Sequence, residues 1–158
     1  MRRFLTFAVL VALAVPATSG ARGQGPNDGT LSVRDARGTI IISARGGVIG
    51  SFAQGSVRIV DPVEGDGSGP IVSGDEFRRE IDEKTDLFRG TKVRFRIIGG
   101  GFRIVIKGRG INLSLVGKGN VTLNGAGTGA DGVYSINGDE YSPIPDFPFP
   151  FALSAAGP

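Results

Sequence analysis

The sequence predicts an all-β fold of antiparallel strands. From Gly29 onward, short runs of β-branched residues alternate with glycine turns, which is typical of such strands. Glycine supplies 27 of the 158 residues. The connections between runs are two to four residues long, so neighbouring strands should pair as hairpins. In addition, residues 31–61 recur without a gap at residues 95–125.

The repeat preserves the apolar spacing and the turn glycines, which are the features that determine a fold. A shift of 64 positions places Ile40 on Ile104 and Val57 on Val121. No residue of catalytic type recurs with them. We therefore expect a duplicated four-stranded meander. Because one meander cannot bury its apolar face alone, two copies should form a β-sandwich or a small eight-stranded barrel.

Eight strands are expected in the two copies. The first copy contains strands over 30–35, 38–44, 47–52 and 55–61, and the second over 91–98, 101–107, 110–115 and 119–124.

The N-terminal residues 1–21 have the pattern of an export signal. Arg2 and Arg3 precede an apolar stretch, and small residues offer cleavage after Ala17 or after Ala21. The protein should therefore be secreted or associated with the cell envelope, with no transmembrane segment in the mature chain. The remaining chain divides into a flexible leader (22–28), a single β domain (29–142) and a Pro/Phe-rich tail (143–158).

The linker between the copies, residues 62–90, contains a short candidate helix. Ser73 and Glu76 have the spacing of a capping box, and Phe77 and Ile81 lie one helical turn apart. A helix over about 74–84 is the expectation. The alternative is an irregular crossover loop that packs Phe77 into the core.

Two further features follow the second copy. Asn137-Gly138 favours a two-residue hairpin turn, which would place Tyr134 opposite Tyr141. The pair would stabilise the hairpin or offer a surface on which a sugar ring stacks. Residues 143–151 alternate Pro and Phe and should not continue a sheet, so they would wrap the core as a strap or remain loose.

The composition excludes several kinds of chemistry. The chain has no Cys and no His, so disulfides, thiolate metal sites and every His-dependent triad are ruled out. Catalysis would have to use carboxylates, Lys, Ser, Thr or Tyr. We expect no cofactor and no metal, and an enzyme is not the favoured class.

Charge is distributed unevenly along the chain. Without Arg2 and Arg3, 16 basic residues face 15 acidic ones, so the mature protein is close to neutral. Residues 61–86 contain nine acidic residues and three basic ones. Residues 87–130 contain eight basic residues and no acidic ones. The basic segment is therefore a candidate binding surface.

A hairpin at Gly99-Gly100 would gather this basic charge on one sheet face. It would pair Arg96 with Arg103 and Lys92 with Lys107, while Phe95 and Phe102 face the other way. Like charges placed opposite each other destabilise a sheet, so an anion should cover them. The predicted anion-binding residues are Lys92, Arg94, Arg96, Arg103 and Lys107, with Arg109 and Lys118 nearby.

Three occupants of this face remain open. The first is an external polyanion, such as a phosphate-bearing or uronic-acid polymer of the envelope or an anionic lipid surface. Nucleic acid is not expected, because no aromatic residues interleave with the charges. The second is the protein's own acidic segment, residues 61–86, folded back over the face. The third is solvent alone.

Two other site hypotheses are weaker. Calcium could bind the acidic loop at residues 61–67, or residues 127–133, which look like one unit of the calcium-binding nonapeptide repeat. A carboxylate-based hydrolase would need two acids in different environments. The candidate acids are Asp61, Glu64, Asp66, Asp75, Asp139 and Glu140.

The glycine-punctuated runs at residues 94–106 and 108–125 carry a resemblance. Together they resemble small, uncharacterised exported β-rich proteins of high-GC Gram-positive bacteria, mainly over residues 89–137. The resemblance implies export and a β fold, but no activity. The sequence thus favours an exported, non-catalytic module that binds an anionic partner through a basic sheet face. The alternatives are a structural or protein-interaction module, neutralised by its own acidic segment, and a hydrolase.

Overall fold

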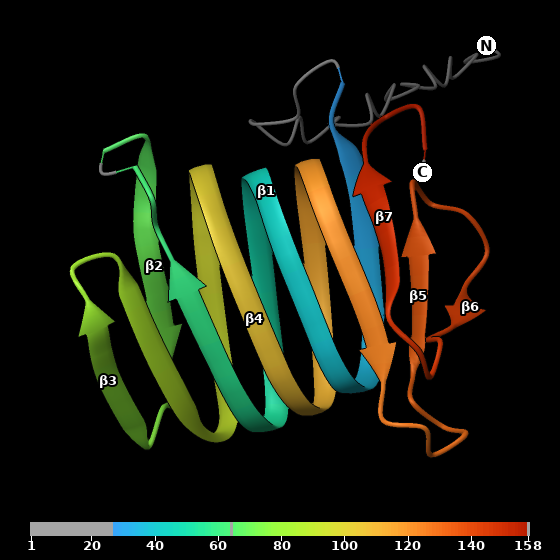
Figure 1. Ribbon diagram of the computed structural model, residues 1–158, viewed down its shortest axis with the longest axis horizontal. Helices are drawn as coiled ribbons and strands as arrows, with labels where there is room; N and C mark the ends of the chain where they lie inside the picture. Colours follow the sequence, from blue (N-terminus) through green and yellow to red (C-terminus); the bar gives the residue numbers. More distant parts are fainter. Residues whose placement is uncertain (1–26, 64, 158) are drawn as a thin grey trace, which may run out of the picture.

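The computed structural model describes residues 27–63 and 65–157, which form an antiparallel all-β fold (Figure 1). The predicted fold class is confirmed: strands make up 75% of the structure, and the described residues contain no helix. The sheet is not closed into a barrel, so the sandwich is the architecture that forms. Within the described residues, no helix could cross a membrane. The predicted signal at 1–21 and most of the leader lie outside the described residues.

Seven strands follow one another in the described part of the chain. They are β1 (Gly29–Val60), β2 (Gly67–Ser73), β3 (Phe77–Asp82), β4 (Thr85–Gly125), β5 (Val133–Ile136), β6 (Ser142–Pro143) and β7 (Phe149–Leu153).

Two of these strands, β1 and β4, are very long and wind around each other as a flattened coil (Figure 1). They run antiparallel, and every straight stretch of β1 after the first, which lies between β4 and β5, lies between two stretches of β4. Ile42, for example, is paired with Ile104 on one side and with Val121 on the other. Both edges of each such stretch are therefore paired, which satisfies the backbone groups of a buried strand.

The coil produces two layers, which lie at the front and at the back of Figure 1. The front layer consists, in spatial order, of β3, residues 85–90, 55–60, 101–108, 38–46 and 118–125, and β7. The back layer consists of β2, residues 91–98, 47–54, 109–117 and 29–37, β5 and β6.

The core lies between the layers and is built by alternation along each strand. Ile104 and Ile106 point inward from the front layer, while Phe52, Phe95 and Leu115 point inward from the back layer. All five are at most 2% exposed. Burying a side chain of this size contributes about 1.5–3 kcal/mol, so the core is the main source of stability in a chain without disulfides.

Glycines permit the bends at which the chain crosses from one layer to the other. At the upper edge Gly46 is paired with Gly117. A Cβ atom on Gly46 would lie 2.2 Å from the Val116 carbonyl oxygen, and one on Gly117 would lie 2.2 Å from the Arg45 carbonyl oxygen. No real Cβ tolerates this distance, so the facing backbones need glycine. The lower edge has the same crowding at Gly38, Gly55 and Gly108.

The predicted strands exist as straight stretches, but the predicted hairpins between them are wrong. Residues 91–98 and 101–107 do not pair with each other, because the bend at Gly99-Gly100 carries the chain from the back layer to the front layer. A hairpin and a wound coil bury the same alternating residues. The apolar pattern therefore could not distinguish them.

The repeat also has a different meaning from the one expected. Ile41 and Val105, which the shift of 64 positions equates, are directly paired in the front layer. The two copies are therefore antiparallel neighbours related by a local twofold axis, not separate sheets packed face to face. Each copy contributes alternate stretches to both layers.

The helix expected over 74–84 is wrong, and so is the alternative of a loop that buries Phe77. This segment contains the edge strand β3, which pairs with residues 85–89 of β4. Phe77 is 46% exposed. Instead of capping a helix, Glu76 accepts hydrogen bonds through Oε1 from the Thr91 amide at 3.2 Å and from the Thr91 hydroxyl at 2.5 Å.

The C-terminal segment partly follows the prediction. Asn137 and Gly138 have φ values of 52° and 83°, and the Asp139 amide donates to the Ile136 carbonyl at 2.9 Å, so the tight turn is confirmed. Tyr134, however, is paired with Ser142 rather than with Tyr141.

The tail was expected not to continue a sheet, which is wrong for its last part. β7 adds to the front layer, where Phe151 is paired with Val121. Pro150 lacks an amide hydrogen, and an edge strand is where the sheet tolerates it.

Candidate anion-binding groove

The five predicted anion-binding residues are all exposed, but they do not share one face. Arg94 and Arg96 lie on the back layer, where Arg96 is paired with Ile49 and Ile71. Arg103 lies on the front layer. The predicted pairing of Arg96 with Arg103 is therefore wrong, because the coil places them on opposite sides of the molecule.

The predicted pairing of Lys92 with Lys107 is also wrong. Lys107 is paired with Thr39 and Ser56 in the front layer. Lys92 belongs to neither outer face: it lies at the bend between the layers, with a left-handed φ of 57°.

Phe95 and Phe102 point away from the basic side chains, as predicted. They are 2% and 3% exposed and belong to the core.

None of the five residues has an acidic partner among the described residues. The ion pairs found there are Arg45–Asp66 and Arg78–Asp86, each at 3.1 Å. The segment at 61–86 does not fold over a basic face. Instead it extends the two layers sideways, as β2 and β3.

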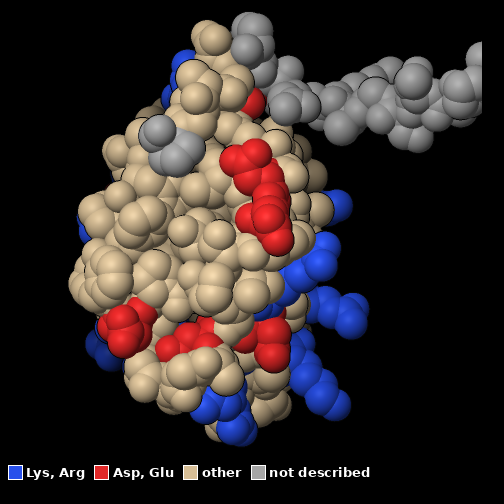
Figure 2. Space-filling view, turned by 90° about the vertical axis from the view of Figure 1, so that its right-hand side faces the viewer, with Lys and Arg blue, Asp and Glu red and all other residues tan. Residues whose placement is uncertain are grey.

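Acidic residues are concentrated at the two ends of the sandwich, although basic residues such as Arg78 and Arg79 lie among them. Figure 2 views the end of the sandwich formed by β5, β6 and β7 and shows acidic side chains on that end. Basic side chains project along the side that is at the back of Figure 1. The opposite end carries the acidic residues of β3 and its flanking turns, such as Asp75, Glu80 and Glu83.

A groove of about 510 Å³ crosses the back layer. Its floor is formed by short side chains on three neighbouring strand stretches, among them Ser32, Ser51 and Ser114. Arg94 and Arg96 rise along one side, and Arg34 rises on the other. Three inter-strand spacings separate the two sides, which corresponds to about 14 Å.

No acidic residue lines this groove; its full lining is Ser32, Val33, Arg34, Ile49, Gly50, Ser51, Ile71, Ser73, Arg94, Phe95, Arg96, Asn112, Leu113 and Ser114.

Arg34 is held in position by Tyr141. Its guanidinium lies over the Tyr141 ring at 4.2 Å from the centroid. The Tyr141 hydroxyl in turn shares a hydrogen bond of 2.8 Å with the Ser32 hydroxyl. A stacked arginine loses less freedom when it binds a ligand, and its remaining N–H groups stay available.

The groove continues past Ser32 and Ser114 into a second hollow of about 280 Å³. Both serines line both spaces. The second hollow is also bordered by Ser135, Asp139 and Tyr141. The combined depression therefore runs from β2 to the β5 turn. It is cationic at one end, and at the other it has hydroxyl groups together with one carboxylate, that of Asp139.

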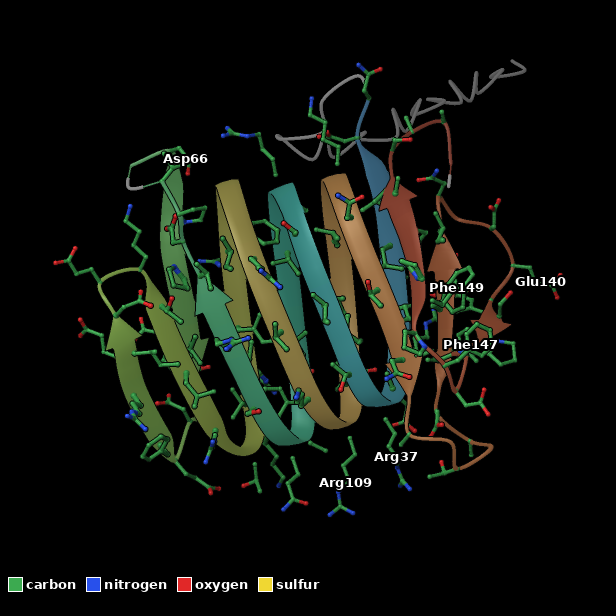
Figure 3. The ribbon with its side chains drawn as sticks, viewed as in Figure 1. Arg37, Asp66, Arg109, Glu140, Phe147 and Phe149 are labelled. Atoms are coloured by element: carbon green, nitrogen blue, oxygen red, sulfur yellow. The ribbon has the colours of Figure 1, made fainter. Side chains whose placement is uncertain are left out.

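Two of the acids proposed for a hydrolase, Asp66 and Glu140, lie at opposite ends of the molecule (Figure 3). Another of them, Glu64, lies outside the described residues. Asp66 instead closes the upper bend, where its Oδ2 accepts from the Gly101 amide at 3.0 Å and from Arg45 at 3.1 Å. The Asp66 carboxylate therefore has a structural role.

The calcium hypotheses gain no support from the described residues. No group of three or more His, Cys, Asp and Glu there could hold a metal ion. Asp131, the acid of the repeat-like loop, accepts hydrogen bonds from the Gly127 amide at 2.7 Å and from the Thr128 hydroxyl at 2.5 Å. The hydrogen bond from the Thr128 side chain, above all, lowers the pKa of Asp131. Its carboxylate is engaged in closing its own loop.

Sequence reasoning missed Arg34 and the floor serines, and it considered Tyr141 only as the partner of Tyr134 in a hairpin or a sugar-stacking surface. Alternation along the strand at 30–35 was sufficient to place Ser32 and Arg34 on the outer side. What the sequence could not reveal is their neighbourhood. Tyr141 contacts Ser32 across 109 positions of sequence, and the wound topology brings them together.

Neither a protein-family model, nor a curated protein, nor a solved structure matches this chain. The fold and the surface define the class: a two-layered all-β protein, wound from two long strands, with a basic groove across one layer.

Proposed function

We propose that this protein is an exported, non-catalytic module of the envelope or the extracellular space that holds an anionic polymer in the back-layer groove. The observation that carries the proposal is the groove itself. Three arginines that have no acidic partner in the described part of the chain border an open floor, where Ser32, Ser51 and Ser114 lie beside the exposed Ile49. Concave sites with a few convergent polar groups are the usual form of a binding site. Export is supported by the N-terminal pattern of Arg2, Arg3 and the apolar stretch that follows.

The binding would be electrostatic and directional. An arginine presents two parallel N–H groups to a carboxylate or phosphate, which is stronger than a single neutral hydrogen bond. Because these charges lie at the surface, dissolved salt screens them, with a Debye length of about 8 Å at physiological ionic strength. Affinity should therefore fall steeply with added salt.

The test compares two double variants that remove the same charge from opposite faces. Arg94→Ser with Arg96→Ser empties one side of the groove, and Arg103→Ser with Lys107→Ser is the matched control on the front layer. Binding of the exported protein to polygalacturonate and to polyphosphate is measured across a salt series. We expect the groove variant to bind at least tenfold more weakly and the control to change less than twofold.

Two outcomes would contradict the proposal. If the unchanged protein binds neither polymer at low salt, the groove is not a polyanion site. If both double variants lose affinity equally, the attraction depends on total charge and not on the groove.

A further inference from the structure

We infer that the polymer is an acidic polysaccharide, an extended chain of sugars that carry spaced anionic groups. This inference rests on the proposed function, because it names the occupant of the same groove. It depends on the groove features other than charge, namely free hydroxyl groups, curvature and the distances between the arginines.

Two hydroxyl groups of the floor have no hydrogen-bond partner among the described residues. Ser51 and Ser114 line the groove, and neither side chain makes a hydrogen bond within the described part of the chain. Neutral hydroxyl groups contribute little to the recognition of a bare polyphosphate. They match the many hydroxyl groups of a sugar chain, each able to donate and to accept.

The arginines are too widely spaced for a polymer with charge on every short unit. Arg94 and Arg96 stand two residues apart on one strand, about 7 Å, and Arg34 is about 14 Å away across the floor. Between them lie Ser51, Ser114 and the exposed side chain of Ile49 (60% exposed). This pattern fits anionic groups carried one to a sugar unit, each on a ring that also offers neutral hydroxyl groups and an apolar face.

Two other anionic partners fit this surface less well. Bases of single-stranded nucleic acid stack on exposed aromatic rings. The aromatic residue that lines the 510 Å³ groove is Phe95, which is 2% exposed. An anionic bilayer is met by a continuous set of apolar side chains that project into it, whereas here two exposed isoleucines, Ile49 and Ile71, stand among three arginines and the serines.

The depression is also long enough for several sugar units. From β2 to β5, neighbouring strand stretches of the back layer are separated by five inter-strand spacings, which add up to about 24 Å. Affinity should therefore rise with the length of an oligosaccharide and level off when the groove and the neighbouring 280 Å³ hollow are filled.

The experiment removes hydroxyl groups without changing charge. Ser51→Ala with Ser114→Ala is compared with Ser43→Ala and Ser56→Ala, which lie on the front layer beside Arg103 and Lys107. The probes are oligogalacturonates of increasing length, polyphosphate, single-stranded oligothymidylate and phosphatidylglycerol vesicles. The groove variant should bind the longer oligogalacturonates about tenfold more weakly, with polyphosphate binding changed less than twofold. The front-layer variant should match the unchanged protein.

The inference and the proposed function can fail separately. If polyphosphate, oligothymidylate or vesicles bind more tightly than any oligogalacturonate and depend on Arg94 and Arg96, the groove is an anion site but not a polysaccharide site. Equal binding of all oligogalacturonates by the serine variant and the unchanged protein would also overturn the inference. If no probe binds at low salt, the proposed function fails with it.

Discussion

On the back layer, Arg34 stacks on Tyr141 at the side of a groove with serines on its floor. On the front layer, Arg103 lies beside Ser43 and Val60, and among the described residues no aromatic ring stacks on it. Both outer surfaces are basic. In the middle of the front layer, however, the branched side chains of Ile41 and Val105 stand half-buried. The difference teaches that charge alone does not define a site here. A shallow, open groove and a pre-positioned arginine are what the back layer adds to its charge.

The largest expected effect is on stability, and it should come from a substitution at the glycine bends between the two layers. In Gly117→Ala, the new methyl group would lie 2.2 Å from the Arg45 carbonyl oxygen. Because both the backbone and its neighbour would have to move, we expect a loss of about 4 kcal/mol of unfolding free energy. Urea denaturation measures it.

The matched control is Gly69→Ala, where an added Cβ has nothing within 4 Å. It should change stability by less than about 0.5 kcal/mol. Similar stabilities of the two variants would show that the upper bend does not depend on glycine, and the explanation of the two layers would fail.

This dependence on bends explains how much of the fold was predictable. Alternation of Val, Ile and Phe identified the strand stretches and the buried side of Phe95 and Phe102, because a period of two is visible within one strand. Whether a glycine pair turns the chain back or carries it to another layer is not a local property. Gly99-Gly100 has positive φ at both positions, as a hairpin turn would, yet it is a bend between layers.

The candidate site was predictable to a similar extent. The excess of basic residues after Leu87 drew attention to Arg94 and Arg96, because charge counts need no topology. The groove also requires Arg34 and Ser114, which come from different long strands and meet through pairings of β1 with β4. When a strand stretch is assigned to the wrong layer, the residues that form one surface are grouped incorrectly, as happened for Arg96 and Arg103.

The second prediction tests depth directly. In Ser114→Leu, an apolar side chain fills the floor of the groove without altering charge. We expect binding of oligogalacturonate to weaken about tenfold, or about 1.4 kcal/mol. Ser43→Leu on the front layer is the matched change and should have less than a twofold effect. If filling the floor leaves affinity intact, the hollow is not where the polymer lies.

A smaller effect should follow when Arg34 loses its support. In Tyr141→Leu, the ring beneath the guanidinium is removed, and Arg34 must then be ordered by the ligand. We expect about threefold weaker binding, or roughly 0.6 kcal/mol, measured by calorimetry.

Tyr141→Phe keeps the ring and loses only the 2.8 Å hydrogen bond to Ser32. It should bind like the unchanged protein. A loss in the Phe variant as large as that in the Leu variant would mean that the hydroxyl group, not the stacking, positions this side of the groove.

The smallest effect concerns Lys92, which belongs to neither surface. Its φ of 57° is unfavourable for a residue with a Cβ, so Lys92→Gly relieves strain, although glycine also gives the unfolded chain more freedom. The net expectation is a gain of about 0.5 kcal/mol, with polymer binding unchanged. Lys107→Gly, within a regular strand stretch, should instead lose about 1 kcal/mol. If the urea midpoints fall equally in both variants, the bend at Lys92 is not strained. If Lys92→Gly alone binds the polymer more weakly, the binding site includes the lower edge as well as the groove.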